Sequence, residues 1–583
     1  MCGFFVIYNK SQNSVNKDLF LKSGNLIQHR GPDDRSTYFD KKISMLFHRL
    51  SIRDLSLNGR QPMHSESKNL IIVFNGEIYN SNELKIKYNL TNLRGKSDTE
   101  VLLELYYKYG TSIMPELNGM FSFLIYDKIK RSCFVARDRY GIKPMYFSEN
   151  DEHIIFSSEI KPILNYISIR KFDSQTFGNF FFRGYMDHDE STFFKEVKTI
   201  LPSTFRIFKQ GTSYTKKYWD ISEIAKIKKY KNIEIVQNKL KFLFNRSIKS
   251  HLISDIDVGS CLSGGNDSTT ISENCKKFIN YKLKTFTYEF EEITNNENSE
   301  TNLASTIAKK NNYDNFQAIV NEEYALNNFD KLINEVESPI TSIRLFGIRK
   351  LYELAKLKNI KVMLEGHGGD EVLAGYDYNY LSSVIDSSNK KDVFSQIFDK
   401  KKIKKFGLNK LVNFIYCLQS QGNFTSDGTP YLIFNLYNKD FVNNFLSDNQ
   451  EIFEKKKLNH LQYSQSLEVS KIHLPRVLKY VDRLSMNNGV EARVPFLDNN
   501  LFDYCFSLEN NLKIRNFQNK WIWKKTYKKM GINKNKKTIT DPQKNWFKTS
   551  LRELFEDEIN SSYVRNSDFF DYKNIVHYFE NYK

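Results

Sequence analysis

Cys2 is the residue whose type and position most directly suggest covalent chemistry in this chain. It is followed by the small residue Gly3, so removal of Met1 would leave a cysteine with both a thiol and a free α-amino group. An α-amine has a pKa near ~8, so it can take the thiol proton at neutral pH without help from a histidine. A cysteine at position two also occurs by chance, so the interpretation depends on the residues that accompany it.

Several polar segments that follow strand-like runs carry groups suited to binding a free amino acid. Arg49 offers a planar guanidinium for an α-carboxylate, and Glu77 and Asp98 offer anions for an ammonium group. Asn75 and the N–H of Gly76 could hold the oxyanion formed when a thiolate attacks a side-chain amide. The alternative is ordinary turn chemistry, because NG and GPD sequences form tight turns in many proteins. The segments are HRGPD at 29–33, RLSI at 49–52, FNGE at 74–77 and SDTE at 97–100.

A glycine-rich segment near the middle of the chain has the composition of a phosphate-binding turn. The sequence SGGNDS at 263–268 follows the apolar run 258–262 and precedes residues that can begin a helix. Two glycines let backbone N–H groups approach an anion, and the helix N-terminus adds partial positive charge. The segment lacks the GKS or GKT of a P-loop, so it is a different kind of phosphate site. A surface turn with a helix cap is the alternative.

A second segment of the same kind supplies acidic residues. The sequence LEGHGGDE at 364–371 also follows a strand-like run and ends in Asp370 and Glu371. Magnesium prefers carboxylates together with phosphate oxygens. Asp267 and Asp370, each at the end of a strand, are therefore predicted to hold Mg²⁺ with a pyrophosphate group.

The composition limits the classes of protein to consider. A length of 583 residues allows two to four domains, and 40% hydrophobic with 14% aromatic residues excludes a disordered chain. The formal net charge of +18 admits nucleic acid or phosphate-rich partners, but the lysines are scattered, which favours a generally basic surface. The six cysteines show no CxxC spacing, which favours a reducing cytosol. With no apolar run of about 18 residues and no signal-peptide pattern, a soluble, cytoplasmic protein is expected.

The elements that position these residues fall into two patterns. Short apolar or alternating runs predict a sheet-rich first domain with a helix over 99–109, hence an α+β layered fold. Beyond a change of pattern near residues 205–225, strand-like and helical runs alternate, which indicates an α/β domain with a parallel sheet. The last third, from about residue 392, is expected to be mostly helical. The predicted strands are 3–8, 43–47, 69–74, 120–126, 132–136, 145–148, 154–158, 283–290 and 360–364, and the later helices are 299–310 and 347–356.

The order and spacing of the segments after Cys2 resemble the glutamine amidotransferase domains with an N-terminal nucleophile found in the asparagine synthetase family. Further segments that carry the resemblance are LNGMF at 117–121, ARDRYGIKP at 136–144 and SSEIK at 157–161. The resemblance implies an N-terminal-nucleophile hydrolase fold in which Cys2 attacks glutamine, forms a γ-glutamyl thioester and releases ammonia. It also implies that glutamine is bound by Arg49, Ile52, Asn75, Gly76, Glu77 and Asp98.

The second half resembles the ATP pyrophosphatase domain of the same family. The SGGNDS segment is similar to its SGGxDS loop, and the segments DRLSM at 482–486 and VEARVPFLD at 490–498 are similar to its DRxSM and ExRxPFLD blocks. The resemblance implies a glutaminase domain over 2–210, an adenylating synthetase domain over 225–583, ATP and Mg²⁺ as cofactors, a homodimer, and Lys520 as the residue that stabilises charge on the adenylated carbonyl and the departing pyrophosphate. The implied ATP-binding residues are Leu262, Ser263, Gly264, Gly265, Asp267, Ser268, Tyr288, Glu365 and Gly366.

Two residues depart from the family pattern where the acceptor carboxylate is expected. Typical members have serine and glutamate at the positions of Glu365 and His367, so aspartate as the acceptor is less secure than the adenylation chemistry. Thr341 and Arg344 match a segment near the acceptor in some members, although a surface helix start explains them equally well. The segment KKTITDP at 536–542 lacks the family's usual Gly-Phe step.

The resemblance therefore favours a glutamine-dependent asparagine synthetase, with amidation of another carboxylate, such as a uronic acid in surface-polysaccharide synthesis, as the alternative. An RNA-modifying ATP pyrophosphatase is disfavoured, because it has no use for a glutaminase domain and would need a compact basic patch. A non-catalytic relative is disfavoured because Cys2, Arg49, Asp98, Asp267 and Asp370 are all present. The expected partners are small molecules, without nucleic acid or membrane.

Overall fold

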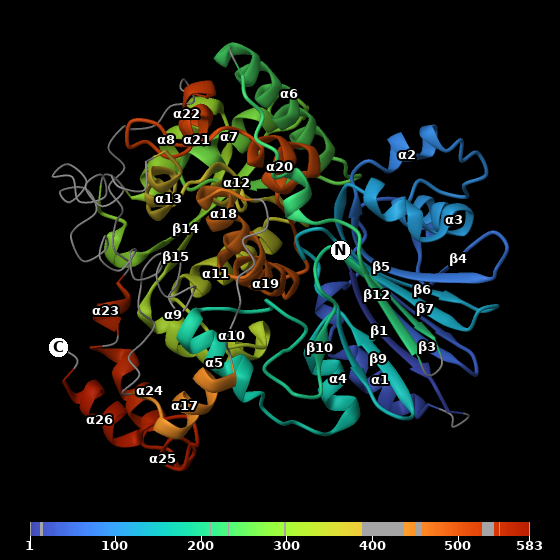
Figure 1. Cartoon of the computed structure of the whole chain (residues 1–583), viewed down its shortest axis with the longest axis horizontal. Coiled ribbons are helices and arrows are strands. Elements are labelled where there is room, and N and C mark those ends of the chain that lie inside the picture. The colour runs from blue at the N-terminus through green and yellow to red at the C-terminus, as the bar shows by residue number, and fades with distance from the viewer. Residues whose placement is uncertain are drawn as a thin grey trace.

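The computed structural model has a sheet-rich N-terminal half and an α/β C-terminal half that lie side by side (Figure 1). Residues 534–541, which include most of the KKTITDP segment, lie outside the described residues. The structure describes residues 2–11, 15–209, 212–230, 232–296, 299–387, 436–448, 458–527, 542–546 and 548–581.

The N-terminal half consists of two antiparallel six-stranded sheets stacked face to face. The first has the order β10-β8-β9-β1-β3-β2 and the second β12-β11-β7-β6-β5-β4. Apolar side chains of both sheets share one core, in which Val6 and Phe47 of the first pack with Val73 and Leu124 of the second. The strands are β1 (Cys2–Asn9), β2 (Asp34–Phe39), β3 (Ile43–Arg49), β4 (Met63–His64), β5 (Leu70–Ile78), β6 (Gly119–Asp127), β7 (Ser132–Arg137), β8 (Tyr146–Glu149), β9 (His153–Ser157), β10 (Lys198–Thr199), β11 (Thr204–Lys209) and β12 (Thr212–Lys217).

Helices cover the outer faces of this pair of sheets. Helix α3 (Asp98–Tyr109) packs against β5 of the second sheet, and α4 (Ile160–Ile167) packs against β9 of the first, next to α1 (Lys17–Asn25). The start of α3 is fixed by its sequence, because the Ser97 side chain accepts a hydrogen bond from the Thr99 N–H as an N-cap. The predicted helix and the predicted layered α+β fold are confirmed.

The C-terminal half is built on a parallel sheet of order β15-β14-β13-β16-β17. Helices pack against this sheet, which confirms the α/β prediction. They are α7 (Asn266–Cys275), α8 (Glu300–Asn311) and α11 (Arg344–Leu357), with α6 (Ile233–His251) packed on α7. Helix α11 begins three residues before the predicted helix. The strands that were not predicted include β2, β4, β10, β11, β12, β15 and β17. The sheet strands are β13 (Val258–Cys261), β14 (Lys284–Phe290), β15 (Asp314–Val320), β16 (Val362–Leu364) and β17 (Glu491–Arg493).

Helices make up most of the described C-terminal third, as expected. Helix α19 (His473–Met486) packs against β17 of the parallel sheet, and α18 (His460–Ser470) packs against α19. Helices α24 (Ser550–Ile559) and α26 (Tyr572–Glu580) lie in the red lower corner of Figure 1. Strand β12 continues the second sheet to Lys217, and the expected domain division at 210–225 stays a prediction. Within the described residues, none of the helices combines the length and the hydropathy that a membrane span requires.

Buried ion pairs join the two halves. The Arg30 guanidinium, from the HRGPD segment, is fully buried and lies 2.9 Å from both Glu159 and Asp482. Arg483 of the DRLSM segment donates to Glu337 at 2.7 Å and to the Ser158 carbonyl at 3.1 Å. The conspicuous HRGPD and DRLSM motifs therefore meet each other, and Arg30 lies in the interface between the two halves of the chain.

This interface gives a stability prediction. Asp482→Asn should lower the free energy of unfolding by about 3–5 kcal/mol, because it leaves the buried Arg30 guanidinium with one carboxylate fewer. Asp220→Asn is the matched control: its ion pair with Lys217 is exposed, so a change below about 1 kcal/mol is expected. Guanidinium denaturation followed by fluorescence measures both. Equal effects of the two substitutions would contradict a structural role for the buried pair.

Candidate functional site

Cys2 begins β1 and lies at the edge where the two stacked sheets meet. Its Cα is paired with Arg49 across β1 and β3, and its backbone N–H donates to Asn75 Oδ1 at 3.1 Å. The Asn75 Nδ2 group is buried and has no hydrogen-bond partner among the described residues. Burial raises the pKa of the Cys2 thiol, while the Leu50 backbone N–H and the Arg49 guanidinium oppose that shift. The backbone nitrogen of Cys2 therefore lies against an amide group whose own donor has no partner in the described part of the chain.

Two carboxylates from neighbouring elements complete this end of the sheets. Glu77 lies on β5 and Asp98 in the first turn of α3, where it accepts hydrogen bonds from the Ile78 and Thr99 N–H groups. Burial raises the pKa of Glu77 to about 8, and the charge of Asp98 adds to the shift. Gly76, between Asn75 and Glu77, is required because a Cβ there would lie 2.1 Å from the Met120 carbonyl oxygen. The polar groups at this end of the sheets are the Cys2 thiol, the Asn75 amide and the carboxylates of Glu77 and Asp98. All of them come from segments that the sequence pattern singled out.

The other two predicted glutamine ligands are Arg49, at the end of β3, and Ile52, in the loop that follows it. Arg49 donates to the carbonyl oxygens of Ser56, at 3.0 Å, and Asp54. The Ile52 carbonyl accepts a hydrogen bond from the Asp255 N–H of the C-terminal half at 2.9 Å, and Asp255 Oδ2 accepts one from the Asp54 N–H. The segment that carries Arg49 and Ile52 is therefore fixed by the loop after α6.

The second group of predicted residues gathers at the carboxyl ends of β13 and β16. The loop of residues 262–265 connects β13 to α7. In the first turn of α7, the Ser268 hydroxyl oxygen accepts a hydrogen bond from the Ser263 backbone N–H at 3.2 Å. Gly264 has φ +70° and a Cβ there would lie 2.6 Å from Leu303 Cβ, so only glycine fits. Crevices at the carboxyl ends of parallel strands are the usual ligand sites of such sheets. The structure thus has a tight strand-to-helix turn here, and its phosphate-binding role stays a prediction.

Lys520 lies between two carboxylates at this same edge. Its Nζ is 2.5 Å from Asp267 Oδ2 and 2.7 Å from Asp370 Oδ1, with Asp370 on α12 (Gly369–Leu373). Burial opposes the charge of Lys520, but the two carboxylates hold its pKa above the ordinary value. Asp267 Oδ1 is buried without a hydrogen-bond partner in the described part of the chain. Gly375 is required nearby, since a Cβ would lie 1.8 Å from Asp370 Oδ1 and 2.4 Å from Lys520 Cε.

Glu365 follows β16 and points into a small cluster of polar groups. Its Oε1 accepts hydrogen bonds from Tyr352 at 2.5 Å and from the Cys261 thiol at 3.0 Å, and its Oε2 lies 3.7 Å from His367 Nε2. Its backbone N–H donates to the Arg493 carbonyl at 2.8 Å. The carboxylate is nearly buried while the imidazole of His367 is one-third exposed, so His367 lies on the open side.

The remaining predicted residues are less well connected to these clusters. Tyr288 lies on β14 and packs closely against α11, where a Cβ on Gly347 would lie 2.1 Å from its ring. Thr341 and Arg344 are exposed at the start of α11, and their place at the acceptor stays a prediction. Sequence reasoning missed Tyr352, which could have been noticed only from its position two turns into a helix that packs on the sheet.

Comparisons with known proteins match each half of the chain to a known family. Residues 1–219 match the family described as glutamine amidotransferase domain, and residues 239–583 match asparagine synthase. The chain is 28% identical to asparagine synthetase (glutamine-hydrolyzing) 1 of Bacillus subtilis, over 96% of this chain and 90% of that protein. It is 32% identical to putative asparagine synthetase (glutamine-hydrolyzing) 2 of Methanocaldococcus jannaschii, over 72% and 84%. It is also 26% identical to the amidase chyE of Penicillium rubens, over 94% and 88%. The chain therefore belongs to the glutamine-hydrolysing asparagine synthetase family of ATP-dependent amide ligases.

Proposed function

We propose that the chain hydrolyses glutamine at Cys2 and uses the ammonia to amidate a carboxylate that its C-terminal half activates with ATP. The observation that carries the proposal is the pairing of Cys2 with Asn75, whose Oδ1 orients the Cys2 nitrogen while its Nδ2 has no partner among the described residues. A buried amide donor without an acceptor is costly unless a ligand supplies one. An oxyanion formed next to the Cys2 thiolate would fill that need.

The glutaminase steps follow from these groups. The α-amine of Cys2, exposed once Met1 is removed, takes the thiol proton, and the thiolate forms a C–S bond to the side-chain amide carbon of glutamine. Asn75 Nδ2 and the Gly76 N–H donate to the resulting oxyanion. The amine returns its proton to the departing nitrogen, which leaves as ammonia, and water then hydrolyses the thioester to glutamate. Arg49 would bind the α-carboxylate, and Glu77 and Asp98 the α-ammonium of glutamine.

The synthetase steps take place at the edge of the parallel sheet. An acceptor carboxylate oxygen attacks the α-phosphorus of ATP, pyrophosphate leaves, and ammonia then displaces AMP from the acyl carbon to give an amide. The 262–265 loop and Ser268 would cradle the phosphates, and Lys520 would stabilise negative charge on the pyrophosphate and acyl-adenylate oxygens. Asp267 and Asp370 fit Mg²⁺, because two carboxylates meet here and Asp267 Oδ1 lacks a partner among the described residues. The ion would neutralise pyrophosphate charge.

We propose aspartate as the acceptor and asparagine as the product, with the cytoplasm as the location and a homodimer as the assembly. The B. subtilis and M. jannaschii relatives, which are named asparagine synthetases, support aspartate. A second candidate, a larger carboxylate such as a uronic acid, is favoured by one observation. His367 places a partly exposed imidazole on the open side, with the nearly buried Glu365 carboxylate 3.7 Å behind it, which suits hydroxyl groups of a sugar.

The acceptor is tested by measuring AMP and pyrophosphate release with ATP, Mg²⁺ and glutamine, comparing aspartate with a panel of uronic acids. Turnover with aspartate and stoichiometric asparagine is the expected result. Glu365→Gln should raise the KM for the true acceptor more than tenfold, because the neutral amide loses the charge that faces His367. Activity with a uronate and none with aspartate would reject asparagine synthesis and keep the chemistry.

A further inference from the structure

Glu77 and Asp98 form a pair of buried carboxylates that requires positive charge nearby. Their exposed fractions are 3% and 5%, and burial raises the pKa of each. Two carboxylates in such a place repel each other and lose hydration, and a cation close to them offsets part of this cost. The identity of that cation determines what the ammonium group of a ligand has to replace.

Two guanidinium groups flank Glu77, and they are held very differently. Arg53 Nη1 lies 2.5 Å from Glu77 Oε1, and Arg493 Nη2 lies 3.7 Å from Glu77 Oε2. Arg493 is anchored by Glu491 and by two backbone carbonyls, at 2.7 Å each, from the end of α6 and the loop after it. In the described part of the chain, Glu77 is the single hydrogen-bond and ion-pair partner of the Arg53 side chain. Arg53 is therefore the cation that can leave.

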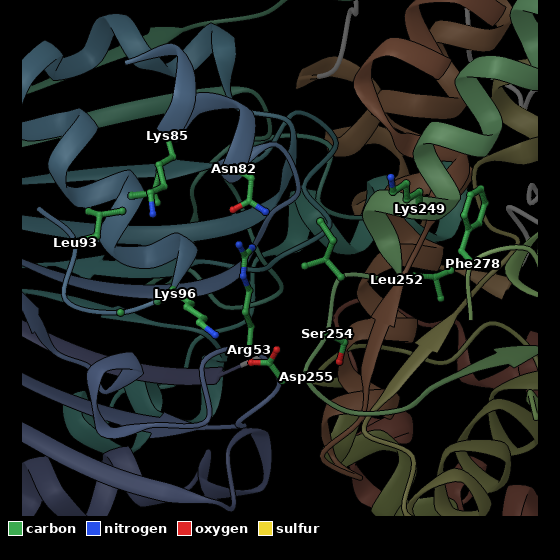
Figure 2. A pocket seen from close by; sticks show the side chains of 14 residues that line it. Arg53, Asn82, Lys85, Leu93, Lys96, Lys249, Leu252, Ser254, Asp255 and Phe278 are labelled. Carbon is green, nitrogen blue, oxygen red and sulfur yellow. The ribbon is translucent and has the colours of Figure 1, made fainter. Parts of the chain in front are cut away.

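Arg53 also has space into which it can move. It lines a cleft of 480 Å³ between the two halves of the chain, with Lys96 and Ser97 on its own side and Ser254 and Asp255 across from it (Figure 2). The backbone around Arg53 is fixed on both sides, by the Ile52 carbonyl and the Asp54 N–H, which bond to Asp255. The side chain can thus rotate into the cleft, toward the carboxylate of Asp255, without displacing the loop.

Resting on the proposed role of Glu77 and Asp98 as ligands of the glutamine α-ammonium, we infer that Arg53 is a specificity-determining residue of the glutaminase site. Its guanidinium lies where the ammonium of glutamine would bind and withdraws into the cleft when glutamine enters. With Arg53 in place, an incoming ammonium would make three cations around two carboxylates, and Arg493 is too firmly anchored to leave. An amide without an ammonium group has nothing to exchange for Arg53 and is rejected.

The inference is tested by comparing glutamine with glutaramate, which is glutamine without its α-amino group. The measured quantity is the ratio of kcat/KM for the two amides in the wild-type protein, in Arg53→Met and in Arg53→Lys. Methionine is also unbranched, but it is shorter and carries no charge, so Glu77 is free to take a proton and the site no longer demands a cation. The ratio should fall at least about tenfold in Arg53→Met, through a lower KM for glutaramate, and stay within about threefold of wild type in Arg53→Lys.

The outcomes separate this inference from the proposed function on which it rests. A merely structural role of Arg53 would lower kcat/KM for both amides equally, and an unchanged ratio in Arg53→Met overturns the inference. If Glu77→Gln and Asp98→Asn leave the KM for glutamine unchanged, or if the wild-type protein does not hydrolyse glutamine, the proposed ammonium site fails and the inference fails with it. AMP release with added ammonia, measured for each variant, identifies any protein that has not folded.

Discussion

Cys2→Ala is expected to reduce glutamine hydrolysis at least about a thousandfold while synthesis from added ammonia continues at a rate close to that of wild type. The thiol is the atom that forms the covalent bond, so nothing else at the site can replace it. Asn75, Glu77 and Asp98 remain in place in the variant, and glutamine should still bind. The synthetase cluster around Lys520 lies at the edge of the parallel sheet, whereas Cys2 lies on β1 of the N-terminal half.

The measurement is glutamate release with glutamine as nitrogen donor, alongside AMP release with ammonium chloride. Cys133→Ala is the matched control, because it removes another buried thiol of the same half of the chain, on β7 in the shared core. Cys133→Ala should keep both activities, and a glutamine analogue with an electrophilic side chain should label wild type and the control but not Cys2→Ala. Loss of ammonia-dependent synthesis in Cys2→Ala would mean that the two sites are not separable.

The placement of the Cys2 and FNGE motifs on strands was predictable, because each adjoins an apolar run of the sequence. Cys2 opens an apolar run, FNGE ends another, and both are found on strands, β1 and β5. What the sequence does not contain is the distance between them, since these strands belong to different sheets. Their ends approach only because Val6 and Val73 pack in one core, so the hydrogen bond from Cys2 to Asn75 follows from sheet stacking and from nothing local.

Several charged residues that the sequence would place on turns or on the surface are buried in the structure. Arg30 and Asp482 are 452 positions apart, and no local pattern marks them as partners. Strand β17 was not predicted because it is only three residues long and has charged residues, Glu491 and Arg493, at its two ends. Such a segment lacks the apolar pattern that predicts a strand. Glu491 and Arg493 are buried because they pair with each other and with groups from the N-terminal half, which only the assembled fold supplies. Arg53 was not identified from the sequence for the same reason. Its partner Glu77 was expected to bind the ammonium group of glutamine, so no partner within the protein was sought for it.

Lys520→Met is expected to lower kcat for AMP formation by about a hundredfold to a thousandfold and to leave glutamine hydrolysis unchanged. The cation contacts both Asp267 and Asp370 and would face the phosphate oxygens on which charge develops, so its loss affects the reacting state more than the binding of ATP. A fall in kcat with a small change in the KM for ATP is therefore the expected signature.

Lys525→Met is the matched control, because Lys525 lies on the same short helix, α22 (Trp521–Thr526), but is exposed. It should leave AMP formation within about twofold of wild type. A large increase in the KM for ATP without a change in kcat would show that Lys520 only binds the nucleotide. Equal losses in the two variants would show that the helix, and not the charge between the carboxylates, is what the reaction needs. The structure favours a role for the charge of Lys520 over a role for the helix alone. A Cβ on Gly375 would collide with both Asp370 and Lys520, so glycine at this position allows the two side chains to make contact.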